Sequence, residues 1–183
     1  MATTTVRTVK VNRAPVMALW GAVVAQRLGY NWEEALTLGQ AVSVLNARSK
    51  GKRLGIIAEE KPEEKAAKER ARREAAPGEE RVELLGRSVY AKRSDAGLRA
   101  VIGEETENPK RIEGYLRSKF GEAYGAVKEV LEGLANSYSP EELKQVAYSL
   151  YEQFRPQVAA GQRGWGQRGE LDLETIRELA KSR

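Results

Sequence analysis

The sequence predicts a mainly α protein in which an N-terminal helical hairpin (helix-turn-helix-like) and a C-terminal helical bundle are separated by a small β-hairpin. Three observations predict this fold class. Apolar residues recur at helical spacing on both sides of a turn at Leu28-Gly29. Four further segments after residue 107 show the same spacing. Strand-like alternation is confined to residues 6–11 and 81–102.

The first of these segments combines an extended arm with a helix. Residues 6–11 alternate β-branched and polar side chains, which predicts a short strand or an extended arm. Asn12 then resembles a helix cap, and Pro15 falls in the first turn, where its missing N–H costs little. The helix is expected over about residues 13–28, because apolar side chains recur at Val16, Trp20, Val23, Val24 and Leu28.

A second helix is expected over about residues 31–48. Asn31 and Glu34 have the spacing of a capping box, and one apolar face follows them. Ala25 and Gly29 match the spacing of a DNA-binding helix-turn-helix. Glu33 and Glu34, however, would place two carboxylates where such a helix approaches phosphates. A packed antiparallel hairpin is therefore favoured over a recognition helix.

The middle of the chain changes composition twice. Residues 59–80 consist mostly of Lys, Arg, Glu and Ala, which predicts a charged linker. Residues 81–102 alternate around a turn at Ser94–Gly97, which predicts a small β-hairpin or short sheet. The expected organisation is a basic arm and hairpin (1–58), the linker (59–80), and a β element with C-terminal helices (81–183).

Helices are expected over about residues 108–118, 120–136, 140–154 and 172–181. The third begins with Ser139-Pro140-Glu141-Glu142, which combines a cap, a first-turn proline and an acidic first turn. Asp172 is interpreted as the cap of the last helix, and Asp95 as a turn residue.

The composition excludes much of enzyme chemistry. The chain has no Cys and no His, which excludes disulfides, zinc held by these residues, thiolate nucleophiles and imidazole bases. No carboxylate pair stands out from the amphipathic faces, so we expect no catalytic residue, no metal site and no cofactor. Because no long apolar run or secretory signal is present, we expect a cytoplasmic protein without a membrane partner.

Charge distribution indicates a polyanionic partner. Residues 1–100 carry 19 Lys and Arg against 12 Asp and Glu, a net of +7, whereas residues 101–183 carry 12 against 14, a net of −2. Residues 7–58 alone contribute +6. The residues expected to bind nucleic-acid phosphates are Arg7, Lys10, Arg13, Arg48, Lys50, Lys52 and Arg53.

The run from Arg48 to Arg53 has a second interpretation. Cations at the C-terminal end of a helix complement its dipole, and Gly51 has the residue type that commonly ends a helix. Phosphate binding is slightly favoured, because four cations in six residues exceed what capping requires.

A glycine-rich stretch over residues 161–169 repeats Gly-Gln-Arg-Gly around one tryptophan. Arg163, Trp165 and Arg168 could stack on a base and pair with phosphate, which makes the stretch a candidate ligand loop. A tryptophan that folds back over the core is the favoured alternative. The stretch lacks the Lys-Ser/Thr pair of a Walker-type phosphate loop.

Several short motifs resemble a family of uncharacterised bacterial proteins over most of the chain. They are Asn12-Arg13-Ala14-Pro15-Val16, Leu19-Trp20, Arg27-Leu28-Gly29, Glu34-Ala35-Leu36-Thr37-Leu38-Gly39, Ser49-Lys50-Gly51 and Arg163-Gly164-Trp165-Gly166. The resemblance implies a recurring unit and carries over no activity, cofactor or site residue.

The sequence therefore favours a non-enzymatic nucleic-acid-binding or regulatory protein, with the C-terminal helices mediating self-association or partner binding. It indicates no preference between DNA and RNA. One alternative is a protein-interaction module whose apolar hairpin faces form a homodimer or receive a partner helix. A second is a small-molecule-binding protein or carboxylate-using enzyme near the Gly/Arg/Trp loop.

Overall fold

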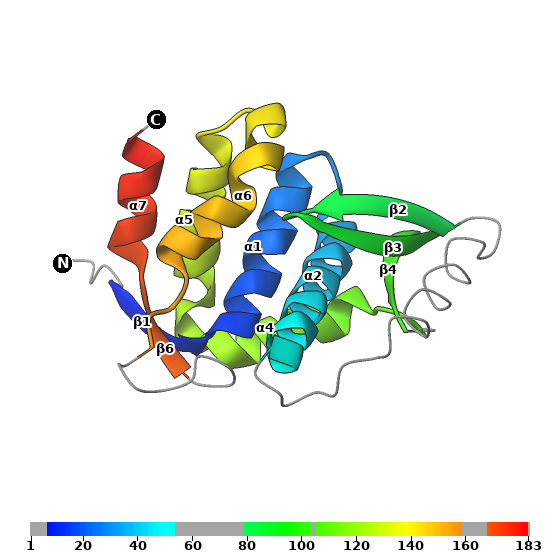
Figure 1. The fold of residues 1–183 in the computed structure, drawn as a ribbon, viewed down its shortest axis with the longest axis horizontal. Coiled ribbons are helices and arrows are strands. Elements are labelled where there is room, and N and C mark those ends of the chain that lie inside the picture. Colours follow the sequence, from blue (N-terminus) through cyan, green and yellow to red (C-terminus); the bar gives the residue numbers. More distant parts are fainter. Residues whose placement is uncertain (1–6, 54–78, 104, 159–167, 183) are drawn as a thin grey trace.

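The computed structural model describes residues 7–53, 79–103, 105–158 and 168–182, and it combines helices with two antiparallel sheets (Figure 1). The elements in chain order are β1 (Thr8–Asn12), α1 (Arg13–Arg27), α2 (Trp32–Arg53), β2 (Glu79–Leu84), β3 (Arg87–Ser94), β4 (Gly97–Ile102), β5 (Glu105–Thr106), α4 (Pro109–Phe120), the short 3-10 helix η1 (Gly121–Ala123), α5 (Tyr124–Asn136), α6 (Pro140–Phe154), β6 (Arg168–Asp172) and α7 (Leu173–Lys181).

Helix α1 is the centre of the molecule. Every residue from Pro15 to Ala25 is buried, and a helix that is apolar on all sides must be covered on all sides. α2, α5 and α6 all pack against it. The Trp20 indole is fully buried, donates its N–H to the Ala147 carbonyl at 2.9 Å, and meets the Phe154 ring edge-on with centroids 5.3 Å apart.

Helices α1 and α2 form an antiparallel pair that crosses at glycines. A Cβ placed on Gly39 would lie 2.3 Å from the Ala18 carbonyl oxygen, so only glycine allows this approach. The Ser43 hydroxyl donates to the Ala14 carbonyl at 2.7 Å. This register places the C-terminal part of α2 beside the start of α1.

The larger sheet has the strand order β2-β3-β4-β5, and its β3 and β4 strands pack against α2. Two-residue turns connect β2 to β3 and β3 to β4. The first turn has φ values of 50° at Leu85 and 75° at Gly86, as a type I′ turn requires. Leu85 is therefore a non-glycine residue in the left-handed region, and its side chain is buried.

The smaller sheet joins segments from opposite halves of the chain. β1 and β6 are antiparallel, with Lys10 opposite Glu170 and Asn12 opposite Arg168. Val11 and Leu171 are buried, so the alternate residues of both strands face outward.

The predicted fold class, mainly α with one small β-hairpin, is wrong. The strands form two antiparallel sheets, one of four strands and one of two. The sequence of β6, Arg-Gly-Glu-Leu-Asp, has little β propensity, and its extended form depends on pairing with β1. The predicted linker lies outside the described residues up to residue 78, and its last two residues begin β2.

The predicted caps at Asn31, Ser139 and Asp172 are confirmed, whereas Asn12 precedes α1 without a side-chain hydrogen bond to the first turn. Asn31 and Glu34 form the reciprocal capping box, with N···O distances of 3.1 and 2.9 Å. Ser139 accepts from the Glu142 N–H at the start of α6, and Asp172 accepts from the Glu174 N–H at the start of α7. The expected end of the second helix is wrong, because α2 continues through Gly51 to Arg53.

Candidate nucleic-acid interface

Cations from five separate segments gather where α1 begins and α2 ends. Figure 1 shows β1, β6 and α4 at this end of the central helices, and α4 packs against β1, α1 and α2. We call this region the basic end. It comprises the described cations Lys10, Arg13, Arg48, Lys110, Arg111, Lys119, Arg155 and Arg168.

Arg13 occupies the junction of β1 and α1. Its Nε donates to the Pro156 carbonyl at 2.9 Å, and the Tyr151 hydroxyl donates to the Arg13 carbonyl at 3.4 Å. Burial and the neighbouring Arg155 guanidinium lower the pKa of Arg13, which stays protonated at neutral pH. Burial raises the pKa of Tyr151 to about 12. Two guanidiniums that repel each other at a partly buried position form a site suited to an anion.

The β1–β6 pair adds exposed cations on its outer face. Lys10 is exposed and lies opposite Glu170, which partly offsets its charge. Arg168 is exposed and lies opposite Asn12, one residue before Arg13. The structure thus brings the start of β6, which includes Arg168 at the end of the predicted ligand loop, next to the N-terminal arm.

The remaining predicted residues are placed as follows. Arg48 is exposed, and the antiparallel register of α2 brings it to the same end as Arg13. Arg7 is exposed, and its carbonyl accepts from the Leu173 N–H at 2.8 Å. Lys50, Lys52 and Arg53 belong to α2, but their side chains lie outside the described part, as do Arg163 and Trp165 entirely.

Helix α4 contributes cations that the sequence analysis missed. It buries Ile112, Leu116 and Phe120 and carries four cations against one carboxylate, Glu113. Lys110 and Arg111 lie exposed in its first turn, where a helix dipole favours acidic side chains. The net charge summed over residues 101–183 is negative and therefore concealed this cluster. Net charge summed over a window of about twelve residues, the length of α4, would have revealed it.

The cations assigned to the basic end lack carboxylate partners, a property that Arg7, Arg27, Arg87, Lys92 and Lys181 share elsewhere in the described ranges. Arg117, also on α4, pairs with Glu113 and is not assigned to this end. In the described ranges, none of the eight forms an ion pair with a carboxylate. By contrast, Arg81 pairs with Glu83 at 2.9 Å, and Arg99 with Glu33 at 3.0 Å. Positive charge left without a carboxylate is available to an anionic partner.

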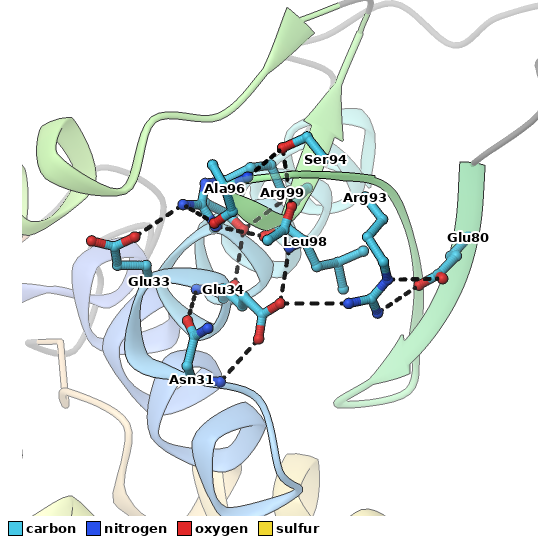
Figure 2. Close-up of polar contacts among 12 residues, drawn as sticks. Asn31, Glu33, Glu34, Glu80, Arg93, Ser94, Ala96, Leu98 and Arg99 are labelled. Atoms are coloured by element: carbon cyan, nitrogen blue, oxygen red, sulfur yellow. Dashed lines mark hydrogen bonds and ion pairs between the residues drawn. The ribbon is translucent and has the colours of Figure 1, made fainter.

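At the N-terminal end of α2, β4 packs against Glu34, whereas Asn31 and Glu33 stay exposed. Figure 2 shows the Glu34 carboxylate between Asn31 and Leu98. The carboxylate accepts a hydrogen bond from the Leu98 N–H at 2.8 Å. The Thr37 hydroxyl accepts from the Ala100 N–H at 3.0 Å. This packing argues against the helix-turn-helix alternative, and Glu34 joins the helix to the sheet.

The pKa of Glu34 reflects this position. Burial disfavours the charged form of the Glu34 carboxylate. Two kinds of contact together outweigh this effect of burial: hydrogen bonds from the N–H groups of Leu98 and Asn31, and the positive charges of Arg93 and Arg99. The pKa of the Glu34 carboxyl therefore lies below its ordinary value. The nearest guanidinium nitrogen, Nη1 of Arg93, is 3.9 Å from Oε2.

We expect Glu34→Gln to lower the free energy of unfolding by about 2 kcal/mol near pH 7, the range for hydrogen bonds to a charged group. Because the folded-state pKa is depressed, the carboxylate stabilises the protein above the unfolded pKa, and this contribution is lost as pH falls through the folded pKa. Urea unfolding should therefore show a smaller difference in the free energy of unfolding between the wild type and Glu34→Gln near pH 3 than near pH 7. Glu33→Gln, at a 59% exposed side chain, is the control with little effect. An equal difference at both pH values would contradict the prediction.

Within the described ranges, no group of three or more His, Cys, Asp or Glu side chains is placed to hold a metal ion. No helix there has the length and apolar character needed to cross a membrane. Comparison with protein-family models, with curated proteins and with solved structures finds no match to the chain.

Proposed function

We propose that the protein binds nucleic acid through the phosphate backbone, with the basic end as the contact surface and no enzymatic step. The observation that carries this proposal is that elements bearing cations without a described carboxylate partner, β1, α1, α2, α4 and β6, meet at one end of the molecule. Phosphate oxygens would neutralise these cations and release condensed counterions, which makes such binding strong at low salt.

The chemistry of the cluster favours phosphate over a carboxylate-bearing small molecule. Arg13 uses only its Nε toward Pro156, which leaves its terminal nitrogens as a fork for phosphate oxygens. Arg48, Arg168 and the α4 cations extend this charge over several elements, as a polymer of phosphates requires. The second alternative of the sequence analysis centred on Trp165, which lies outside the described residues.

Fluorescence anisotropy with labelled duplex DNA, single-stranded DNA and RNA at about 50 and 200 mM salt tests the proposal. We expect binding at low salt and a steep loss at high salt. The triple variant Lys10→Ala, Arg48→Ala, Arg168→Ala should bind at least about tenfold more weakly, with a log–log salt slope shallower by about 2.7. A second triple variant, with Lys50, Lys52 and Arg53 changed to Ala, tests the run predicted from the sequence.

The matched control removes the same charge elsewhere. Arg93→Ala, Lys144→Ala and Arg177→Ala together also lower the net charge by three, but these cations pair with carboxylates. Binding should stay close to the wild-type level. Absence of binding at low salt would eliminate the basic end as the contact surface. Equal weakening in the Lys10/Arg48/Arg168 variant and in the control variant would do the same.

A further inference from the structure

The chain segment that follows α6 is held against β6. Gln157 and Glu170 exchange two backbone hydrogen bonds, with N···O distances of 3.1 and 3.0 Å. A Cβ placed on Gly169 would lie 2.8 Å from both the Gln157 carbonyl oxygen and the Pro156 Cβ, so the two backbones approach closely. These contacts fix the end of α6 beside the β1–β6 pair, toward which the chain runs in Figure 1.

Arg13 and Arg155 meet at this position from opposite halves of the chain. Arg13 is the first residue of α1, and its Nε donates to the Pro156 carbonyl at 2.9 Å. Arg155 precedes Pro156 and directly follows α6. Within the part of the chain that the structure describes, no protein group accepts from the terminal nitrogens of Arg13 or from the Arg155 guanidinium. Both side chains are partly buried, so neither is an ordinary solvated surface cation.

The electrostatics of the pair agree with this placement. Burial lowers the pKa of Arg13, and the positive charge of Arg155 lowers it further. Burial raises the pKa of the Tyr151 hydroxyl to about 12, although both guanidiniums act in the opposite direction. No carboxylate is among the groups that shift either pKa, and the first turn of α1 contains no acidic side chain. Two positive charges therefore lie close together beside one phenol.

The carboxylates on the neighbouring elements do not cancel this charge. Glu152 on α6 and Glu170 on β6 are exposed, and Asp172 caps α7. Among the described residues, none of the three forms an ion pair with Arg13 or Arg155. Two cations held close together repel each other, and a bound anion would relieve that repulsion.

A phosphate monoester matches this pair better than a backbone phosphodiester does. A monoester carries a charge of about −1.5 to −2 near pH 7 and three oxygens that accept hydrogen bonds. Its dianion can neutralise both guanidiniums, each of which presents a planar fork of N–H donors. A phosphodiester carries a single negative charge, so it would leave one guanidinium uncompensated at a partly buried position.

We propose that Arg13 and Arg155 bind the dianion of a phosphate monoester, either a small free monoester or the terminal phosphate of a nucleic-acid strand. Arg13 contributes its terminal nitrogens from the start of α1, and Arg155 contributes its guanidinium from the end of α6. Binding of a terminal phosphate rests on the proposed function, because the strand then also contacts the basic end. Binding of the free monoester does not depend on that function.

Methyl phosphate and dimethyl phosphate are the probes, because they present the monoester and the diester without a nucleoside. NMR of the arginine Nε–H groups of the full chain, at constant ionic strength, follows Arg13 and Arg155 during each titration. We expect both resonances to shift with methyl phosphate, which should bind at least about tenfold more tightly than dimethyl phosphate. In fluorescence anisotropy, a single strand with a 5′-phosphate should bind more tightly than the same strand with a 5′-hydroxyl.

Two variants separate this pair from general positive charge. Arg155→Gln removes one guanidinium of the pair and should weaken methyl phosphate binding at least about tenfold. Arg27→Gln is the matched control, because Arg27 also lies at a helix end and its Nε also donates to a carbonyl, that of Tyr138, at 3.2 Å. The control removes the same charge and should bind methyl phosphate like the wild type.

Two results would overturn the proposal: equal binding of methyl and dimethyl phosphate by the wild type, and unchanged methyl phosphate binding by Arg155→Gln. Methyl phosphate binding without any oligonucleotide binding would support this site and count against the proposed function. A preference for methyl phosphate without a preference for the 5′-phosphorylated strand would support the site with a small free monoester as its ligand. The wild-type titration needs no variant, so a folding defect in Arg155→Gln cannot obscure the outcome.

Discussion

Gly39→Ala is expected to destabilise the protein by about 3 kcal/mol, opposite to the usual effect of alanine inside a helix. An added Cβ would lie 2.3 Å from the Ala18 carbonyl oxygen and 2.5 Å from the Ala22 nitrogen. Both are backbone atoms of α1, so relief requires the two helices to separate. Separation would loosen the packing around the central helix, where voids and shifts are costly.

Chemical denaturation measures this effect, with Gly114→Ala as the matched control. Gly114 lies in the middle of α4, and a Cβ there would meet nothing within 4 Å. That variant should gain about 0.5–1 kcal/mol from the higher helix propensity of alanine. Gly21→Ala should fall between the two, because its nearest contact, the Gly39 Cα, is 2.9 Å away. A Gly39→Ala protein as stable as the wild type would show that α1 and α2 are not packed as closely as described.

The double variant Lys110→Gln, Arg111→Gln is expected to bind nucleic acid more weakly while becoming more stable. Both cations lie in the first turn of α4, where each opposes the helix dipole by about 0.3–1 kcal/mol. Their removal should therefore raise the free energy of unfolding slightly. Loss of two phosphate contacts should make the log–log salt slope of binding shallower by about 1.8.

Anisotropy titration and urea unfolding on the same preparations separate the two effects. The control pair, Lys128→Gln and Lys144→Gln, removes the same charge from α5 and α6, where both lysines form ion pairs within their own helix. It should leave the salt slope unchanged. If the α4 variant bound like the wild type, α4 would not belong to the contact surface and its first-turn cations would be ordinary surface charge.

The sequence predicted local features well where short-range chemistry determines them. Ser139 and Pro140 marked the start of α6, because the cap and the proline act within one turn. Gly51 misled the prediction of where α2 ends, since glycine is tolerated within a helix when its surroundings favour helix. The β1–β6 pair was missed because its partners are far apart in sequence and β6 has no strand pattern of its own.

The candidate site was predicted only in part, because its residues also come together through contacts between distant parts of the chain. Arg13 and Arg48 were recognised as cations, but their presence at one end depends on the antiparallel register of α1 and α2. The proximity of Arg155 to Arg13 arises from the Pro156 contact, which no local pattern indicates.

The central position of α1 has a consequence during protein synthesis. Trp20 donates to a carbonyl 127 residues further along the chain, so much of the cover for this apolar helix is translated long after it. At about 5–20 residues per second, α1 waits roughly 6 to 25 s for α6. During that interval α2 can already pack against α1, but the side of α1 that α5 and α6 cover in the folded protein still lacks its cover.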